Sequence, residues 1–253
     1  MFTDSHCHLA DPQLLPRLPQ VLAQAEAAGV CRFIVPATCG TDFAAVAALK
    51  HPAIHLAFGI HPWFTAQAGA DDMQALESRL LAHPNALVGE IGLDFHANNL
   101  IKSDKAQQTD YFVQQLALAQ RLRRPAIVHN LKATVAVVEA VQRSGFKQGG
   151  IVHAFSGSLE EAKMLIKCGF MIGIGSLLLN PAARKARAAA AQLPLEYLVL
   201  ETDSPFMSVK QQGANTPANV RRIAETMAAL RGVPLAALAA ETENNINRLL
   251  SFR

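Results

Sequence analysis

Short apolar runs alternate with longer helical stretches along nearly the whole chain, and this alternation constrains the fold more than any other feature. The runs predict strands at Phe2–His6, Arg32–Pro36, Ile54–Ile60, Leu87–Ile91, Ala126–His129, Gly150–His153, Phe170–Ile174 and Tyr197–Glu201. Their nearly continuous apolar character is typical of strands that are covered on both faces. Strands that alternate with helices predict a parallel sheet with right-handed crossovers.

The stretches between the strands carry helical spacing and ordinary helix stop signals. Helices are predicted at Leu14–Ala28, before Gly29, at Lys105–Arg123, before Pro125, and at Leu159–Lys167, before Gly169. Glycine after a helix and proline beyond it are the expected terminators. The alanine-rich Ala182–Ala191 also predicts a helix, and Pro217–Leu250 predicts two helices divided by Gly232 and Pro234.

The length of the chain favours one closed barrel. Its 253 residues match a (β/α)₈ TIM barrel, which typically has about 250, and no stretch resembles a linker. We therefore expect a single α/β domain over residues 1–253, although the pattern alone also permits an open doubly wound sheet. The barrel is favoured because candidate metal ligands lie on the first and last strands, and closure makes those strands neighbours.

Composition excludes several functional classes. The net charge of +3 is too small for a protein that holds nucleic acid by bulk electrostatics. The four cysteines form no C-x-x-C pair, which argues against a disulfide framework or a zinc ribbon. The N-terminus lacks a basic segment followed by a long apolar run, and no run reaches the ~20 residues of a membrane span. We expect a cytoplasmic, monomeric enzyme without a membrane partner.

Histidines and carboxylates stand at or near the ends of separate predicted strands. A parallel barrel brings the carboxyl ends of all its strands to one face, and imidazole and carboxylate are ligands of hydrolytic metal sites. The sequence therefore predicts a metal site formed by residues far apart in the chain. The candidate ligands are His6, His8, Glu90, His129, His153 and Asp203.

Three of these candidates suggest specific roles. Side chains two apart in a strand point to the same side, so His6 and His8 can bind one ion. Glu90 stands in an apolar strand, where an ionised carboxylate is costly unless it is paired or coordinated. Its two oxygens could bridge two ions, or it could pair with a buried arginine. Asp203 could bind metal and also accept a proton from a metal-activated water, so Asp203 and Glu90 are the predicted catalytic residues.

Other residues are candidates for substrate contact. His61 ends a strand and could touch substrate or donate a proton, or it could simply form a turn. Ser156 lies in the turn after His153, where backbone N–H groups could receive a phosphate and Ser158 could cap the next helix. Lys185 follows the seventh strand, where barrels often bind phosphate, but it could equally lie on a solvated helix face. Asp94 could orient a metal ligand or a water by hydrogen bonding to it without binding the metal itself.

Five motifs together resemble the TatD family of metal-dependent deoxyribonucleases over the whole chain. They are Thr3-Asp4-Ser5-His6-Cys7-His8, Gly59-Ile60-His61-Pro62, Gly89-Glu90-Ile91-Gly92-Leu93-Asp94, His153-Ala154-Phe155-Ser156-Gly157 and Glu201-Thr202-Asp203-Ser204-Pro205. The resemblance implies a TIM barrel of the amidohydrolase type with two or more divalent ions. It implies one ion held by His6, His8, Glu90 and Asp203, and a second held by Glu90, His129 and His153.

The chain departs from the pattern of that family at two places. Asn130 and Leu131 follow His129 where the family often has Ser or Cys and then Arg. Ala214-Asn215-Thr216-Pro217 stands where the family often has Arg-Asn-x-Pro. Two arginines that could contact phosphate are thus absent, while the predicted metal ligands are all present.

The leading hypothesis is a phosphodiesterase with two divalent ions, which could be Zn, Mn, Ni or Mg, acting on single-stranded DNA or frayed ends. A hydrolase of small amides, lactones or esters is the second hypothesis. Many hydrolases of that kind bridge their metals with a carboxylated lysine, and the presence of Glu90 at this position counts against it. A metal-loaded scaffold without turnover is the third hypothesis, and it would be favoured only if a ligand were missing.

Overall fold

Eight parallel strands form one sheet in the order β1 to β8 in the computed structural model, which describes residues 1–208 and 214–252. The strands are β1 (Phe2–Asp4), β2 (Val30–Pro36), β3 (Ile54–Phe58), β4 (Leu87–Asp94), β5 (Ala126–Leu131), β6 (Gly150–Val152), β7 (Phe170–Ile174) and β8 (Leu198–Leu200). Just beyond the strands, Ser5 N donates to Leu200 O at 2.9 Å and Asp203 N donates to His6 O at 2.9 Å. These bonds join the first strand to the last, so the sheet closes into a barrel and is not an open doubly wound sheet.

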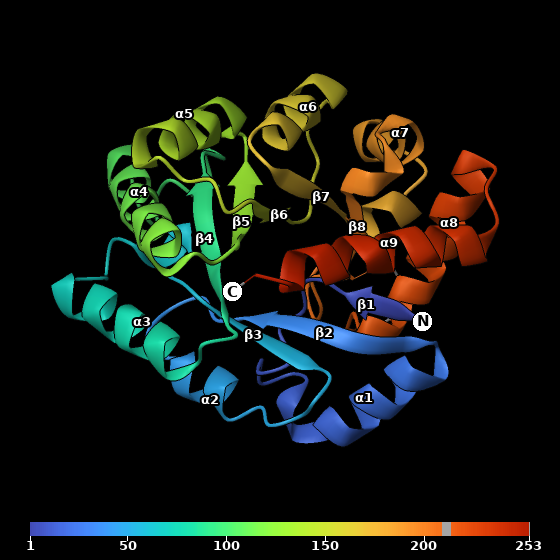
Figure 1. Cartoon of the computed structure of the whole chain (residues 1–253), viewed down its shortest axis with the longest axis horizontal. Helices are drawn as coiled ribbons and strands as arrows, with labels where there is room; N and C mark the ends of the chain where they lie inside the picture. The colour runs from blue at the N-terminus through green and yellow to red at the C-terminus, as the bar shows by residue number, and fades with distance from the viewer. Residues whose placement is uncertain (209–213, 253) are drawn as a thin grey trace.

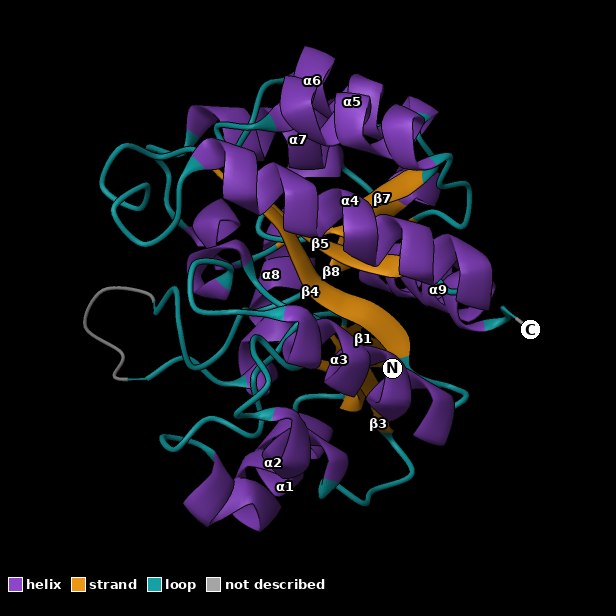
Figure 2. Cartoon of the chain, turned by 90° about the vertical axis from the view of Figure 1, so that its left-hand side faces the viewer, coloured by secondary structure: helices purple, strands orange, loops and turns teal. Residues whose placement is uncertain are grey.

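Helices surround this barrel (Figures 1 and 2). They are α1 (Leu18–Ala27), α2 (Phe43–Ala47), α3 (Ala70–Ala82), α4 (Lys105–Leu122), α5 (Thr134–Ser144), α6 (Leu159–Lys167), α7 (Arg184–Gln192), α8 (Val220–Arg231) and α9 (Leu235–Leu250). Within residues 1–208 and 214–252, five short 3₁₀ turns lie in the connections, at Leu15–Arg17, Pro62–Phe64, Ser176–Leu179, Leu195–Tyr197 and Pro217–Asn219.

The helices agree with the predicted ones except at their ends. The helix predicted at Leu14–Ala28 becomes α-helical only at Leu18, because Pro16 and Pro19 lack the N–H that an interior helical residue donates. Helix α6 has the predicted bounds, and Ser158 caps it by accepting from Glu161 N at 3.2 Å. The helix predicted at Ala182–Ala191 is observed as α7, which runs from Arg184 to Gln192. Helices α2, α3 and α5 were not among the predicted ones.

The barrel interior is apolar at its amino-terminal end. Seven strands each contribute one side chain to this inner cluster, and α9 closes it with Ile246 and Leu249; the strand residues are Ile34, Ala57, Leu87, Ile127, Ile151, Met171 and Val199. Figure 1 shows α9 running across this end of the barrel. The barrel interior is therefore filled by side chains at this end, and the carboxyl ends of the strands form the opposite, open face.

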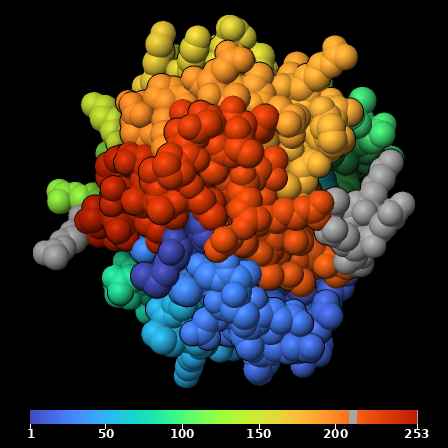
Figure 3. Space-filling view, turned by 90° about the vertical axis from the view of Figure 1, so that its right-hand side faces the viewer, coloured from blue at the N-terminus to red at the C-terminus, as the bar shows by residue number. Residues whose placement is uncertain are grey.

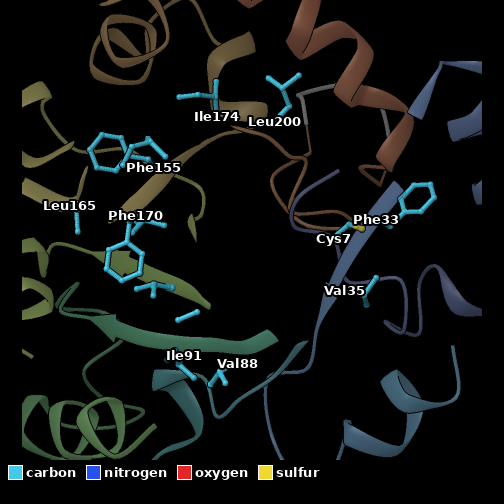
Figure 4. Close-up of a cluster of buried hydrophobic side chains, with 14 of the residues drawn as sticks. Cys7, Phe33, Val35, Val88, Ile91, Phe155, Leu165, Phe170, Ile174 and Leu200 are labelled. Atoms are coloured by element: carbon cyan, nitrogen blue, oxygen red, sulfur yellow. The ribbon is translucent and has the colours of Figure 1, made fainter. Parts of the chain in front are cut away.

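A second apolar layer lies between the strands and the surrounding helices. Phe33 and Val35 on β2, and Phe170 on β7 with Leu165 on α6, belong to this outer cluster (Figure 4). The alternation along β2, with Ile34 in the inner cluster and its two neighbours in the outer one, is the two-residue period of a strand. The space-filling view shows the N-terminal segment against the C-terminal helices (Figure 3).

Within the described residues, none of the helices alone has the length and apolar character to cross a membrane. The segments Pro217–Arg231 and Leu235–Leu250 meet that criterion only as a pair, and they meet at a bend of 113°.

Candidate metal centre

The structure brings all six predicted metal ligands together at the open face of the barrel. His6 and His8 follow β1, His153 follows β6 and Asp203 follows β8, whereas Glu90 and His129 lie within β4 and β5. The expectation that Glu90 and His129 stand at the ends of their strands was therefore wrong, since β5 continues to Leu131. Strand β4 continues to Asp94, and its register against β5 shifts between Val88 and Ile91, so Glu90 faces the site from the middle of an irregular strand.

His6 and His8 also reach the site in a different way from the one predicted. Strand β1 ends at Asp4, so neither histidine is a strand residue. Between them, Cys7 forms an isolated parallel bridge with Ser204, which keeps the chain extended. The two imidazoles consequently point the same way, with their Nε2 atoms 3.2 Å apart, while Cys7 Sγ lies 3.8 Å from Ile34 O.

The two oxygens of the Glu90 carboxylate face different groups of side chains. Glu90 Oε2 lies 3.2 Å from His6 Nε2 and 3.7 Å from His8 Nε2. The same two histidine nitrogens lie 3.5 and 3.3 Å from Asp203 Oδ1. These four residues form the first donor group.

Glu90 Oε1 faces three other histidines. It lies 2.8 Å from His153 Nε2, 3.2 Å from His129 Nδ1 and 3.2 Å from His61 Nε2. His129 Nδ1 and His153 Nε2 are 3.3 Å apart. These residues form the second donor group. In the described part of the chain, Glu90 is thus partnered by histidines rather than by the buried arginine of the alternative interpretation.

The spacing of these donor atoms fits divalent metal ions. Bonds of about 2.0–2.2 Å from zinc to nitrogen and oxygen place the ligand atoms of a tetrahedral site roughly 3.3 Å apart. The described residues include three groups whose ligand atoms all lie within 4.8 Å of one another inside each group. The groups are His6–His8–Asp203, His6–Glu90–His153 and His61–Glu90–His129. In this arrangement the lone pairs of neutral imidazoles and of carboxylates point toward common positions, and a cation at such a position would bind them.

Hydrogen bonds distinguish His129 from His61. His129 Nε2 lies 3.3 Å from Asp94 Oδ2, so its proton faces that carboxylate and Nδ1 is left to face the centre. His61 Nδ1 accepts from Trp63 N at 3.1 Å, which places the proton on Nε2, directed at Glu90. His129 is therefore prepared as a ligand, whereas His61 is prepared as a hydrogen-bond donor.

The charge state of His61 agrees with this assignment, whereas that of His129 is set by its two carboxylate neighbours. Burial lowers the pKa of His61 to about 4, so its imidazole is neutral near pH 7. Burial also disfavours charge on His129, but the adjacent Asp94 and Glu90 raise its pKa to about 9. Metal ligands must be deprotonated to bind, so a cation at the second group would displace the proton on His129 Nδ1.

The two predicted catalytic carboxyls are ionised. Burial alone would raise the pKa of Glu90, but the facing His153, His61 and His6 outweigh it and hold that pKa well below its usual range. The pKa of Asp203 is also lowered, because the hydrogen bond from His8 and the nearby His6 and His153 outweigh its burial.

A cavity of about 430 Å³ opens above the two donor groups. Ser156 and His61, the two other residues predicted to touch substrate, line it. Lys185 is exposed on α7 and does not line it, so it could touch only a part of the substrate that extends beyond the cavity.

The apolar side chains that wall this cavity were not among the predicted site residues. They are Trp63, Phe64, Leu177, Phe206 and Met207, with Leu131 noted only as a departure from a motif. Their nearness in the chain to His61 and Asp203 was the available signal, since residues that follow barrel strands form the rim of the site.

Glu201 lies outside both donor groups. Its side chain is fully buried, and its Oε1 accepts from Ala154 N at 2.7 Å. Burial raises its pKa well above the usual range. It supports the turn that begins at His153, so its role is structural.

Comparisons with known proteins agree with the fold and the centre. The family model described as TatD related DNase matches residues 3–251. The chain is 33% identical to the uncharacterized metal-dependent hydrolase YjjV of Escherichia coli (strain K12), covering 99% of this chain and 98% of that protein. It is 27% identical to the putative deoxyribonuclease tatdn3 of Danio rerio, covering 99% and 97%. The crystal structure of YjjV, a TatD homologue, superimposes with a TM-score of 0.92 over 98% of this chain and 97% of that one.

Proposed function

The chain belongs to the TatD-related DNase family of metal-dependent hydrolases, and from that premise we propose that it is a phosphodiesterase that trims single-stranded DNA or frayed duplex ends. The observation that carries the proposal is the position of Glu90. One carboxylate oxygen faces His6, His8 and Asp203, and the other faces His129 and His153. His6, His8, Glu90 and Asp203 would hold one divalent ion, and Glu90, His129 and His153 would hold a second.

Each part of the centre has a role in this proposal. Bound divalent ions, with Zn, Mn, Ni and Mg as candidates, supply Lewis-acid activation of water and of a phosphoryl oxygen. Asp203 accepts the proton of the attacking water, because its carboxylate is ionised and lies on the side of the cavity. His61 keeps Glu90 oriented through its Nε2 proton, and Ser156 contacts the phosphate.

The shape of the site supports a single strand or an end as substrate. The cavity of about 430 Å³ is in the range of sites for small molecules, about 300–1,000 Å³, so it can admit one nucleotide but not an intact duplex. The deoxyribonuclease activity named for the zebrafish relative and for the family supports DNA over other phosphodiesters.

A hydrolase of small amides, lactones or esters is the second candidate. The observation that favours it is the absence of lysine and arginine from the described residues that line the cavity. The glutamate at the bridging position and the family favour phosphodiester cleavage instead.

Metal content and substrate choice together test the proposal. We expect about two ions per chain after reconstitution with Mn²⁺ or Zn²⁺, and shortening of labelled single-stranded DNA that chelator abolishes. Glu90→Ala should reduce the content of both ions, and His129→Ala should mainly remove one, as measured by elemental analysis. Glu26→Ala and His51→Ala, at exposed positions, are the matched controls. Metal-loaded protein that leaves every nucleic acid intact but cleaves a small amide or lactone would replace the first candidate by the second.

A further inference from the structure

The cavity above the metal centre has apolar walls beside its polar floor. The walls are formed by Trp63, Phe64, Leu131, Leu177, Phe206 and Met207, and the floor by Glu90, Asp203 and the histidines. A site that only held a phosphate chain would need cations rather than rings on its walls. We therefore expect the apolar walls to contact the part of the substrate that lies next to the scissile bond.

Several of these apolar side chains are exposed to solvent. Phe206 is 47% exposed, and Phe64 and Met207 are each 38% exposed. Of the eight large apolar side chains that are exposed in the described residues, these three line this one cavity. Apolar groups gathered at one exposed place mark binding sites.

The two phenylalanine rings flank the metal centre from different sides. The ring of Phe206 stands edge-on to His8 of the first donor group, with centroids 5.4 Å apart and planes at 66°. The ring of Phe64 stands against His61, beside the second donor group, at 6.2 Å and 63°. A flat group bound next to the scissile bond would thus meet an aromatic ring close to the ligands.

Fixed positive charge is absent from the same walls. No lysine or arginine is among the cavity-lining residues in the part of the chain that the structure describes. Lys102 contacts one of the walls from outside, with its Nζ 3.2 Å from the centre of the Trp63 ring. It lines a neighbouring cavity behind Trp63 and Phe64 rather than the one above the metal centre.

We propose that Phe206, supported by Phe64, forms a stacking subsite for the base of the terminal nucleotide. This inference rests on the proposed function and specifies how the substrate is held. The metal centre receives the scissile phosphate, and the rings receive the adjacent base. Every base has a π-face, so stacking tolerates any sequence, which suits an enzyme that trims ends.

Binding of two small probes to metal-loaded protein tests this subsite. Thymidine 5′-monophosphate and 2-deoxyribose 5-phosphate share the phosphate and the sugar, and differ in the base. Trp63 is the sole tryptophan of the chain and lines the cavity, so its fluorescence reports occupancy, with calorimetry as the second readout. We expect the wild-type protein to bind the thymidine nucleotide about 5- to 150-fold more tightly, the ratio that base–aromatic stacking implies.

Variants then assign the preference to the ring. Phe206→Ala should remove most of the difference between the two probes, with unchanged affinity for 2-deoxyribose 5-phosphate and unchanged metal content. Phe206→Tyr should restore the difference, because it restores a ring. Leu81→Ala, at a side chain 60% exposed elsewhere, should change neither affinity.

The possible results separate this inference from the proposed function. Equal binding of the two probes, binding of neither, or a preference that survives both Phe206→Ala and Phe64→Ala would overturn the subsite. Binding does not require turnover, so a base preference that Phe206→Ala removes would support the subsite even in a protein that cleaved no DNA. In that case only the proposed activity would fail.

Discussion

At the scale of single residues, Asp203 carries the clearest prediction. Asp203→Asn keeps the shape of the side chain and one coordinating oxygen but removes the proton acceptor. We expect kcat to fall by roughly 10²–10⁴-fold, the usual cost of losing a general base, while the fold is retained. Single-turnover assays on single-stranded DNA, with metal content and circular dichroism measured alongside, check this. Near-normal turnover would remove Asp203 from the chemical step.

Residue types and their order along the chain were sufficient to predict the six candidate ligands, but not how each is oriented. The tautomer of His61 depends on Trp63 N, which approaches Nδ1 because a 3₁₀ turn begins at Pro62. That turn is too short to leave a periodic pattern. Similarly, Asp94 could be suspected of supporting a ligand, but its contact with His129 follows from the register of β4 against β5.

At the scale of elements, the prediction succeeded for strand order and failed at strand ends. Each apolar run predicted a strand, and the eight strands pair in chain order. The run Phe2–His6 was too long, because beyond Asp4 the chain is held by bonds to Leu200 and Ser204 across the closure rather than by a continuing ladder. The predicted strand Leu87–Ile91 was too short, because Gly92 and Leu93 pair with His129 and Asn130. Hydrophobicity does not report either kind of pairing.

Gly92 on β4 packs closely against the backbone of His129 on β5 and so helps to position that ligand. Its φ is +138°, and an added Cβ would lie 2.1 Å from His129 O and 2.8 Å from His129 N. Gly92→Ala should therefore lower the free energy of unfolding by at least about 2 kcal/mol through backbone strain and overpacking. It should also displace His129 and weaken binding of the second ion. Urea unfolding and elemental analysis measure the two effects.

Gly145 provides the matched control for that substitution. Its φ of +66° is also unfavourable for alanine, but an added Cβ there meets no atom within 4 Å. Gly145→Ala should cost only about 1–2 kcal/mol, from the left-handed backbone alone, with metal content unchanged. Equal stability and equal metal content in the two variants would mean that contact with the β5 backbone has no consequence for the site.

At the scale of the whole molecule, closure of the barrel was predictable and the burial of its amino-terminal end was not. Candidate ligands on the first and last strands required those strands to meet, and the bonds between Asp203 and His6 and between Ser5 and Leu200 join them. The helical pattern near the C-terminus predicted a helix without showing what it covers. Helix α9 inserts Ile246 and Leu249 into the inner cluster, and this contact depends on the completed barrel.

The distribution of charge over the molecule leads to a prediction about salt. The net charge is only +3, and the described lining of the cavity has no lysine or arginine. One or two phosphate contacts should therefore govern electrostatic binding of single-stranded DNA. Each contact contributes a slope of about −0.7 to log Kobs against log salt concentration, so the total slope should lie between about −0.7 and −1.4. Fluorescence anisotropy with metal-loaded protein between about 50 and 200 mM salt measures it.

Lys185→Ala should flatten the slope by at most about 0.7, because Lys185 lies outside the cavity and can make one contact at most. A slope several-fold steeper would show that DNA is gripped along an extended basic surface, and recognition confined to the metal centre and its aromatic rim would then be untenable.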